Sequence, residues 1–224
     1  PIDDTLIEAP ETVILTLTAY REDISSSDDL TLSVRPMPYV DAGVPAEICS
    51  GSSYLCSEAV AADCASLLWS TSGDGTFDNP AILHPAYMPG SADMAKGTVE
   101  LTLTGEGIEP CGEIFHTLPL SIIPLPEVPS MPDGPTWVDL YYTPASTYTT
   151  SGSNGSLYYS WSIDPGTAGN MDSDGAQCVI NWNPEFLGNV TISVKGLNDC
   201  GEGLMSEGLE VLIGNTVGFK EDLP

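Results

Sequence analysis

The stretch LLWSTSGDGTF, residues 67–77, runs from an apolar segment through a tryptophan into a turn bounded by glycines. It has two interpretations: a catalytic loop with Asp74 at its tip, or a core strand that leaves a packed interior through a tight turn. The stretch YYSWSIDPGTAG, residues 158–169, decides between them, because it keeps the tryptophan and replaces Asp74. No second carboxylate or histidine in a repeated position could work with Asp74. We therefore interpret the stretch as architecture, with Trp69 in a core and Gly73-Asp74-Gly75 as an exit turn whose glycines accept positive φ.

Three strands of one pattern recur along the chain, each alternating apolar and polar residues as a half-buried strand does. They are TVILTLTAY (12–20), TVELTLTGE (98–106) and NVTISVKGL (189–197), followed respectively by LTLSV (30–34), LPLSI (118–122) and LEVLI (209–213). Trp69 precedes Val99 by 30 residues, and Trp161 precedes Val190 by 29. The chain therefore repeats one unit about every 90 residues, and we expect Trp161 to lie in a core as Trp69 does.

Units of this length, rich in strands and turn signals, predict an all-β fold of tandem immunoglobulin-like β-sandwich domains. Helix is nearly absent from the pattern. The one candidate is SADMAKG, residues 91–97, whose serine offers half of a capping box. Proline-rich joints place the second repeat at residues 37–124 and the third at residues 125–213. Proline stiffens such joints, so we expect neighbouring repeats to form a semi-rigid rod.

The first repeat, residues 1–36, is partial: it contains only the last two strands of a unit and no tryptophan. Two strands cannot bury a core alone. Either the chain begins in the middle of a domain, or this hairpin completes the sheet of a partner by strand addition. The chain starts with Pro1 and shows no leader, so either a leader has been removed or a longer protein precedes it.

Charge excludes two classes of partner. The 224 residues carry 32 Asp and Glu against 5 Lys and Arg, for a net charge of −27. Nucleic acids and anionic membrane surfaces both require clustered cations, and the five here are scattered singly. No run of about 18 apolar residues is present, so we expect no membrane insertion. The surface favours divalent cations or a solvated acidic coat.

Six cysteines, an even number, stand without the spacing of a metal site: Cys49, Cys56, Cys64, Cys111, Cys178 and Cys200. Neither His84 nor His116 lies at zinc-ligand spacing from a cysteine. The pattern favours disulfides and an oxidising, extracellular setting, with free buried thiols as the alternative. The four cysteines of the second repeat allow three pairings, which the spacing alone leaves open.

The second repeat contains, in order, Cys49 and Gly51, the run Trp69 to Phe77, Tyr87 with Pro89, Asp93, and the strand Val99 to Leu103. In this order it resembles the immunoglobulin-like repeat of large surface proteins from bacteria with type IX secretion. The third repeat, through residues 158–169 and 190–203, resembles the polycystic-kidney-disease-like (PKD-like) module of the same proteins. Its start, residues 131–142, departs from that module because it has no cysteine.

The resemblance implies three disulfides. In the family the early cysteine has a mate after the valine strand, which implies Cys49 with Cys111. Cys56 and Cys64 are then left as a local pair, and Cys178 and Cys200 remain for the third repeat. Bridges of this kind add about 2 to 4 kcal/mol each, which matters for units this small.

The tail GNTVGFKEDLP, residues 214–224, resembles the linker that precedes a type IX sorting domain, which is removed at the cell surface. The alternative is a generic acidic tail. This resemblance implies that the chain is the C-terminal end of a secreted or surface-attached protein.

Two features are candidates for a binding site. Asp172 and Asp174 precede a glycine at the spacing that begins a calcium loop, although the later bidentate glutamate is absent. A turn of small polar residues is the alternative, and we expect no other cofactor. Aromatic residues gather in the third repeat, where exposed members could stack on sugars and inward members belong to the core. They are Trp137, Tyr141, Tyr142, Tyr148, Tyr158, Tyr159, Trp161 and Trp182.

Catalysis finds little support, since no nucleophile elbow, P-loop or zinc-protease motif is present. We predict a non-catalytic stalk, spacer or adhesion and filament module on the outer cell surface or secreted. Its partners would be neighbouring repeats of the same protein, surface glycans or other cell-surface proteins. The alternative is a carbohydrate-binding accessory region of a secreted polysaccharide-degrading enzyme.

Overall fold

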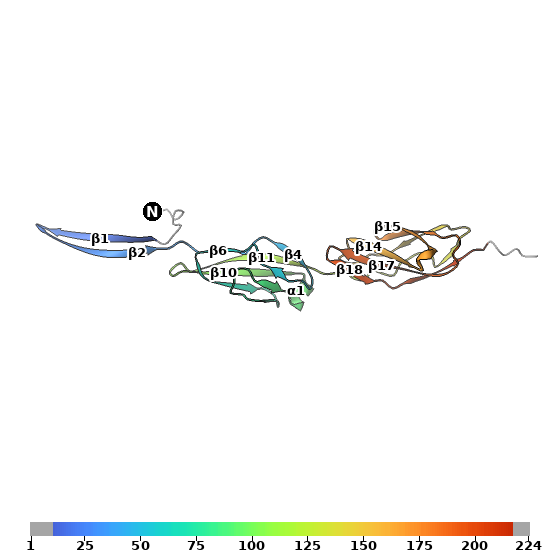
Figure 1. Ribbon diagram of the computed structural model, residues 1–224, viewed down its shortest axis with the longest axis horizontal. Coiled ribbons are helices and arrows are strands. Elements are labelled where there is room, and N and C mark those ends of the chain that lie inside the picture. Colours follow the sequence, from blue (N-terminus) through green and yellow to red (C-terminus); the bar gives the residue numbers. More distant parts are fainter. Residues whose placement is uncertain (1–10, 217–224) are drawn as a thin grey trace, which may run out of the picture. The chain divides into compact units, whose positions relative to one another are not determined.

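The computed structural model describes residues 11–216, and the chain divides into two compact units, Pro1–Ile122 and Ile123–Pro224. The described residues are almost entirely strands and turns, in six sheets (Figure 1). The first unit contains the hairpin of the first repeat and the sandwich of the second repeat. The second unit contains the sandwich of the third repeat. Among the described residues, no helix has the length and apolar character needed to cross a membrane.

The first repeat is a two-stranded antiparallel hairpin of β1 (Glu11–Arg21) and β2 (Ile24–Val34). A two-residue turn joins the strands, in which Glu22 has a φ of 50°. Its second strand begins six residues before the predicted LTLSV, because the ladder continues through the polar residues 24–29. The strands pair without a shift from Glu11 opposite Val34 to Arg21 opposite Ile24.

The main sheet of the second repeat has the strand order β4-β11-β10-β7. Smaller sheets, β3-β6 and β5-β9-β8, complete the repeat. The strands are β3 (Tyr39–Asp41), β4 (Ala46–Cys49), β5 (Tyr54–Leu55), β6 (Val60–Ala62), β7 (Cys64–Thr71), β8 (Thr76–Phe77), β9 (Ala86–Met88), β10 (Thr98–Gly107) and β11 (Glu113–Ile123). The predicted helix is present as α1 (Ser91–Lys96).

The third repeat contains two sheets that face a common core. One has the order β12-β19-β17-β14 with β18 paired to β17, and the other has the order β13-β16-β15. The strands are β12 (Trp137–Asp139), β13 (Ala145–Thr149), β14 (Tyr158–Asp164), β15 (Gly169–Asp174), β16 (Gln177–Trp182), β17 (Gly188–Asn198), β18 (Gly201–Met205) and β19 (Leu209–Gly214). One turn of 3-10 helix, η2 (Gly166–Ala168), follows β14.

Each complete repeat has its own core with a tryptophan in it, at the positions that the sequence predicts. Trp69 is 2% exposed and Trp161 is 7% exposed. Around Trp69 pack the inward residues of β10 and β11, and around Trp161 pack those of β17 and β19. Each indole donates a hydrogen bond to a carbonyl 14 residues further along, of Leu83 and of Gly175, both at 3.2 Å. The hydrogen bond satisfies the one polar atom of each buried indole.

Candidate functional site

The stretch that carries the resemblance folds into a network of hydrogen bonds between two aspartates, which we call the aspartate clasp. It comprises Asp74 in the turn after β7 and Asp93 in the first turn of α1, with Tyr87 of β9 between them. Asp93 is 2% exposed, whereas Asp74 is exposed. The clasp joins the turn after β7, the strand β9 and the helix α1, with Asp74 and Asp93 19 residues apart in the sequence.

Asp93 acts as a buried acceptor for donors from two loops. Its Oδ1 accepts the backbone N–H of Asp74 at 3.2 Å. Its Oδ2 accepts the N–H of Gly75 at 3.0 Å, the N–H of Gly90 at 3.1 Å and the Tyr87 hydroxyl at 2.6 Å. A buried carboxylate requires such donors, because removing it from water without them is costly.

The side chain of Asp74, in turn, caps the N-terminus of α1. Its carboxylate oxygens accept the backbone N–H groups of Ala92 at 3.0–3.1 Å and of Asp93 at 3.1 Å. These N–H groups belong to the first turn of α1 and have no partner within the helix. Hydrogen bonds from the Ala92 and Asp93 backbones hold the pKa of Asp74 below its ordinary value. A carboxylate committed in this way stabilises a helix end and is a poor general acid.

The clasp corrects two expectations. The helix is capped at Gly90 and by the remote Asp74, not by Ser91, which is its first residue. The glycines of the exit turn do not adopt positive φ. A Cβ on Gly73 would lie 1.6 Å from Asp93 Oδ1, and one on Gly75 would lie 2.3 Å from the Tyr87 hydroxyl. Close approach, not backbone conformation, requires glycine at both positions.

Aromatic rings link the clasp to the core. The ring centroids of Trp69 and Phe77 are 5.7 Å apart, and those of Phe77 and Tyr87 are 4.9 Å apart. Burial, together with the hydrogen bond to Asp93, raises the pKa of Tyr87 to about 12. The hydroxyl therefore stays protonated and donates to Asp93. The motif residues of the second repeat hold a loop, a helix and a core together.

The predicted calcium residues lie in a strand instead of a loop. Asp172 and Asp174 are exposed on β15, opposite Val179 and Gln177 of β16. The following Gly175, with a φ of 57°, forms the hairpin turn. Among residues 11–216, no group of three or more His, Cys, Asp or Glu side chains is placed to hold a metal ion. Calcium binding stays a prediction, which a melting curve recorded with millimolar calcium and with chelator would test.

The aromatic residues of the third repeat separate into two sets. Trp161, Trp182 and Tyr148 are buried in the core. Trp137 on β12 is 53% exposed, and Tyr141 and Tyr142 in the following turn are 62% and 75% exposed. The rings of Tyr141 and Tyr142 meet edge to face with centroids 4.8 Å apart. Three exposed aromatic residues thus fall within six positions.

The cysteines do not form the three predicted pairs. Cys56, Cys64, Cys111 and Cys178 are free thiols, whereas Cys49 and Cys200 are disulfide-bonded. Since Cys111 and Cys178 are free, neither of the bonded cysteines has its predicted mate.

The fold explains why the local pair fails. Cys56 is fully buried in the core. Cys64 instead directs its Sγ toward the carbonyls of Ala62 and Tyr39, at 3.2 and 3.7 Å. The two sulfurs therefore occupy different environments, and a bridge requires two Cβ atoms about 4 Å apart with matching directions. In the third repeat, Cys178 is buried opposite Tyr148, in the sheet that does not contain Cys200.

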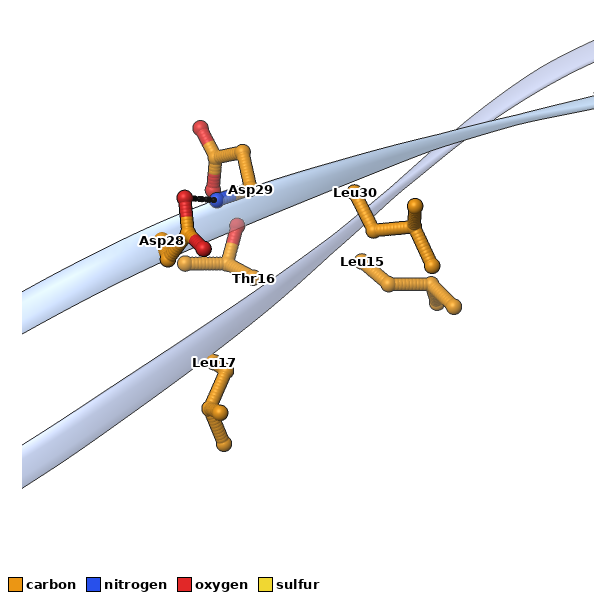
Figure 2. A pocket seen from close by; sticks show the side chains of 6 residues that line it. All are labelled: Leu15, Thr16, Leu17, Asp28, Asp29 and Leu30. Carbon is orange, nitrogen blue, oxygen red and sulfur yellow. Dashed lines mark hydrogen bonds between the residues drawn. The ribbon is translucent and has the colours of Figure 1, made fainter.

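The hairpin of the first repeat presents an apolar face. Val13, Leu15 and Leu17 of β1 share one face with Leu30 and Leu32 of β2, since directly opposed residues point the same way. Figure 2 shows Leu15 and Leu30 side by side in a hollow that Leu17, Thr16, Asp28 and Asp29 also line. Leu15, Leu17, Leu30 and Leu32 are 51%, 75%, 63% and 42% exposed. Among the described residues, β1 pairs only with β2.

Comparison with solved structures places the fold. A crystal structure of titin domains matches with a TM-score of 0.50 and 13% identity, covering 91% of this chain and 75% of the titin chain. The chain folds as tandem immunoglobulin-like β-sandwiches. An I-band fragment of titin matches with a TM-score of 0.44 and 13% identity, over 91% of this chain and 75% of that one. A domain fragment of intimin matches with a TM-score of 0.38 and 12% identity, over 79% and 100%.

Neither a family description nor a curated protein matches this sequence. At 13% identity the titin match shows the fold alone. The predicted linker at residues 214–224 lies outside the described residues from residue 217 onward.

Proposed function

We propose that this chain is a non-catalytic repeat region of a secreted or cell-surface bacterial protein. It acts as a stalk, spacer or adhesion module that holds other domains apart or presents them. The observation that carries the proposal is the repeated register of the core. Trp69 stands opposite Leu103 between β7 and β10, and Trp161 stands opposite Val194 between β14 and β17.

This register shows that the corresponding strands and side chains form the hydrophobic core in the second and third repeats. Leu103 follows Val99 by four residues, as Val194 follows Val190, and all four side chains are buried. Asp74, the residue that a catalytic interpretation would use, is engaged in the clasp. The motif residues of this chain therefore serve the packing of repeated cores. Repeats of this kind are suited to bearing mechanical load and to keeping other domains at a fixed spacing.

The resemblance of the second repeat to immunoglobulin-like repeats of bacterial surface proteins supports an extracellular location. So do the disulfide-bonded cysteines Cys49 and Cys200, since disulfides persist in oxidising compartments. The finer proposal is that the third repeat is a PKD-like module and that the protein leaves the cell by type IX secretion.

Stretching single molecules tests the mechanical role. The second repeat from Tyr39 to Ile123 has 85 residues (123 − 39 + 1). With disulfides reduced, its unfolding should lengthen the chain by the extended length of about 290 Å, at about 3.4 Å per residue, less the distance that the folded repeat already spans. We expect two unfolding steps of this size, one per sandwich. Smooth extension without steps would contradict a load-bearing role.

A second candidate function is carbohydrate binding, favoured by the exposed Trp137, Tyr141 and Tyr142. Exposed aromatic rings offer flat apolar faces for stacking. Titration of soluble plant, algal and host polysaccharides against tryptophan fluorescence tests it. A response that Trp137→Ala removes and that Leu204→Ala, at an exposed position of β18, leaves intact would support this function. If none of the polysaccharides changes the tryptophan fluorescence, carbohydrate binding is contradicted.

A further inference from the structure

The hairpin of the first repeat has the same register as the central hairpins of the two complete repeats. Val13 stands opposite Leu32 and Leu15 opposite Leu30. In the second repeat, Val99 stands opposite Leu120 and Leu101 opposite Leu118. In the third, Val190 stands opposite Val211 and Ile192 opposite Leu209. Position by position, β1 therefore corresponds to β10 and β17.

Burial separates the three hairpins. Leu101, Leu103, Leu118 and Leu120 are each 0% exposed, whereas the corresponding Leu15, Leu17, Leu30 and Leu32 are 42% to 75% exposed. The polar position is shared as well: Asp28 stands opposite Leu17 as the half-exposed His116 stands opposite Leu103. The sequence of the hairpin is thus that of a covered strand pair, while its apolar face is uncovered.

The hairpin of the first repeat differs from the other two at the edge of its first strand. β10 pairs on its second side with β7, and β17 pairs with β14. In both cases the tryptophan faces the third inward residue of the hairpin strand, Leu103 or Val194. In β1 that residue is Leu17, the most exposed of the four leucines. The edge of β1 that points away from β2 is open among the described residues.

We propose that β1 accepts an uncharged β-strand of the β7 type, extended and alternating, with a tryptophan opposite Leu17. Such a strand would complete the sheet of the first repeat through backbone hydrogen bonds and cover the apolar face with its tryptophan. The strand comes from outside residues 1–36, because that stretch contains no tryptophan.

Charge favours this occupant over a second copy of the hairpin. Residues 11–34 carry five acids, Glu11, Glu22, Asp23, Asp28 and Asp29, against the single cation Arg21. A second hairpin would bring the same negative excess to the edge. The strand β7, Cys64–Thr71, carries no charged residue. The neighbour of β10 therefore matches the open edge of β1 in register and in charge, whereas the neighbour of β17, β14, matches in register but carries Asp164.

The experiment uses the 224-residue chain and a synthetic peptide of residues 64–72 with Cys64→Ser. Amide hydrogen exchange is followed by mass spectrometry over residues 11–21. We expect saturating peptide to slow exchange in β1 by about tenfold or more, because its edge amides gain partners. Leu17→Asn should abolish the protection. Thr18→Asn, on the opposite face of the same strand, should retain it.

The Leu17→Asn variant could lose protection because its hairpin no longer folds, so a second peptide provides a control in the unchanged chain. A peptide with Trp69→Ala should fail to protect β1 in the unchanged chain. Absence of protection by the parent peptide, or equal protection by both peptides, would overturn the proposal. Self-association of the peptide-free chain with protected β1 amides would also overturn it, in favour of a second copy as occupant.

Discussion

At the scale of single residues, Asp93 connects the features that distinguish the second repeat. Its carboxylate accepts three backbone N–H groups and the Tyr87 hydroxyl while remaining 2% exposed. Donors from the exit turn and from the segment before α1 meet on this one side chain. Replacement of Oδ2 by a donor group would leave the Gly75 and Gly90 N–H groups and the Tyr87 hydroxyl without this acceptor.

We expect Asp93→Asn to destabilise the chain by about 2 to 4 kcal/mol, since an amide presents a donor where only acceptors fit. Urea unfolding followed by tryptophan fluorescence measures the change. Glu100→Gln, at an exposed position of the adjacent strand, is the matched control and should have little effect. Equal unfolding midpoints for the two variants would show that the clasp contributes nothing.

Asp74 predicts a pH dependence with a definite sign. Hydrogen bonds from Ala92 and Asp93 lower its pKa. A carboxyl with a lowered folded pKa adds stability above its unfolded pKa of about 4 and loses it as pH falls through the folded value. The difference in urea midpoint between the parent chain and Asp74→Ala should therefore be larger at about pH 7 than at about pH 2.5. A difference independent of pH would contradict this assignment.

The free thiols should differ in reactivity. Burial raises the pKa of Cys56 and of Cys178 to about 11, so both stay protonated and shielded. Cys111 is half-buried, in the turn between β10 and β11. In timed alkylation of the native chain, Cys111 should react before Cys56 and Cys178, which should react only after unfolding. If denaturation without reductant exposes no thiols, the pairs implied by the resemblance form after all.

At the scale of elements, the exit turn after β7 depends on the absence of side chains. A Cβ on Gly75 would approach the Tyr87 hydroxyl to 2.3 Å and the Met88 carbonyl to 2.5 Å. Both neighbours are fixed by the clasp and by the β8–β9 pairing, so they cannot move aside at low cost. The turn is shaped by its tertiary contacts.

We expect Gly75→Ala to lower stability by about 1 to 3 kcal/mol through overpacking. Gly166→Ala in η2 of the third repeat is the control, because a Cβ there meets no atom within 4 Å. Thermal melting by circular dichroism compares the two variants. Similar melting temperatures would mean that the turn relaxes without cost.

At the scale of the whole molecule, three hairpins share one strand register. The apolar face is buried in the second and third repeats. The cores of the second and third repeats share no residue. Each contains one strand-centred tryptophan that faces the third inward residue of its partner strand. The corresponding face of the first repeat is uncovered among the described residues.

Trp69→Ala should cost about 3 to 5 kcal/mol and act locally. Hydrogen exchange should rise in β7, β10 and β11 and stay unchanged in β14, β17 and β19, since the substitution affects only one core. Trp161→Ala should produce the reverse pattern. A rise in both repeats after either substitution would argue against separate cores.

The amino-acid sequence by itself determined the strands and their repetition, because period-two alternation and recurrent spacing are local properties. It therefore predicts β1, β10 and β17, the buried Trp69 and Trp161, and the helix at residues 91–97. The tertiary structure decided the partners. Why Gly73 and Gly75 are glycines and which residue caps α1 depend on contacts between residues 12 or more positions apart, and which cysteines are free also depends on the tertiary fold. Such contacts depend on side-chain direction and distance in three dimensions, which the order of residues along the chain does not encode locally.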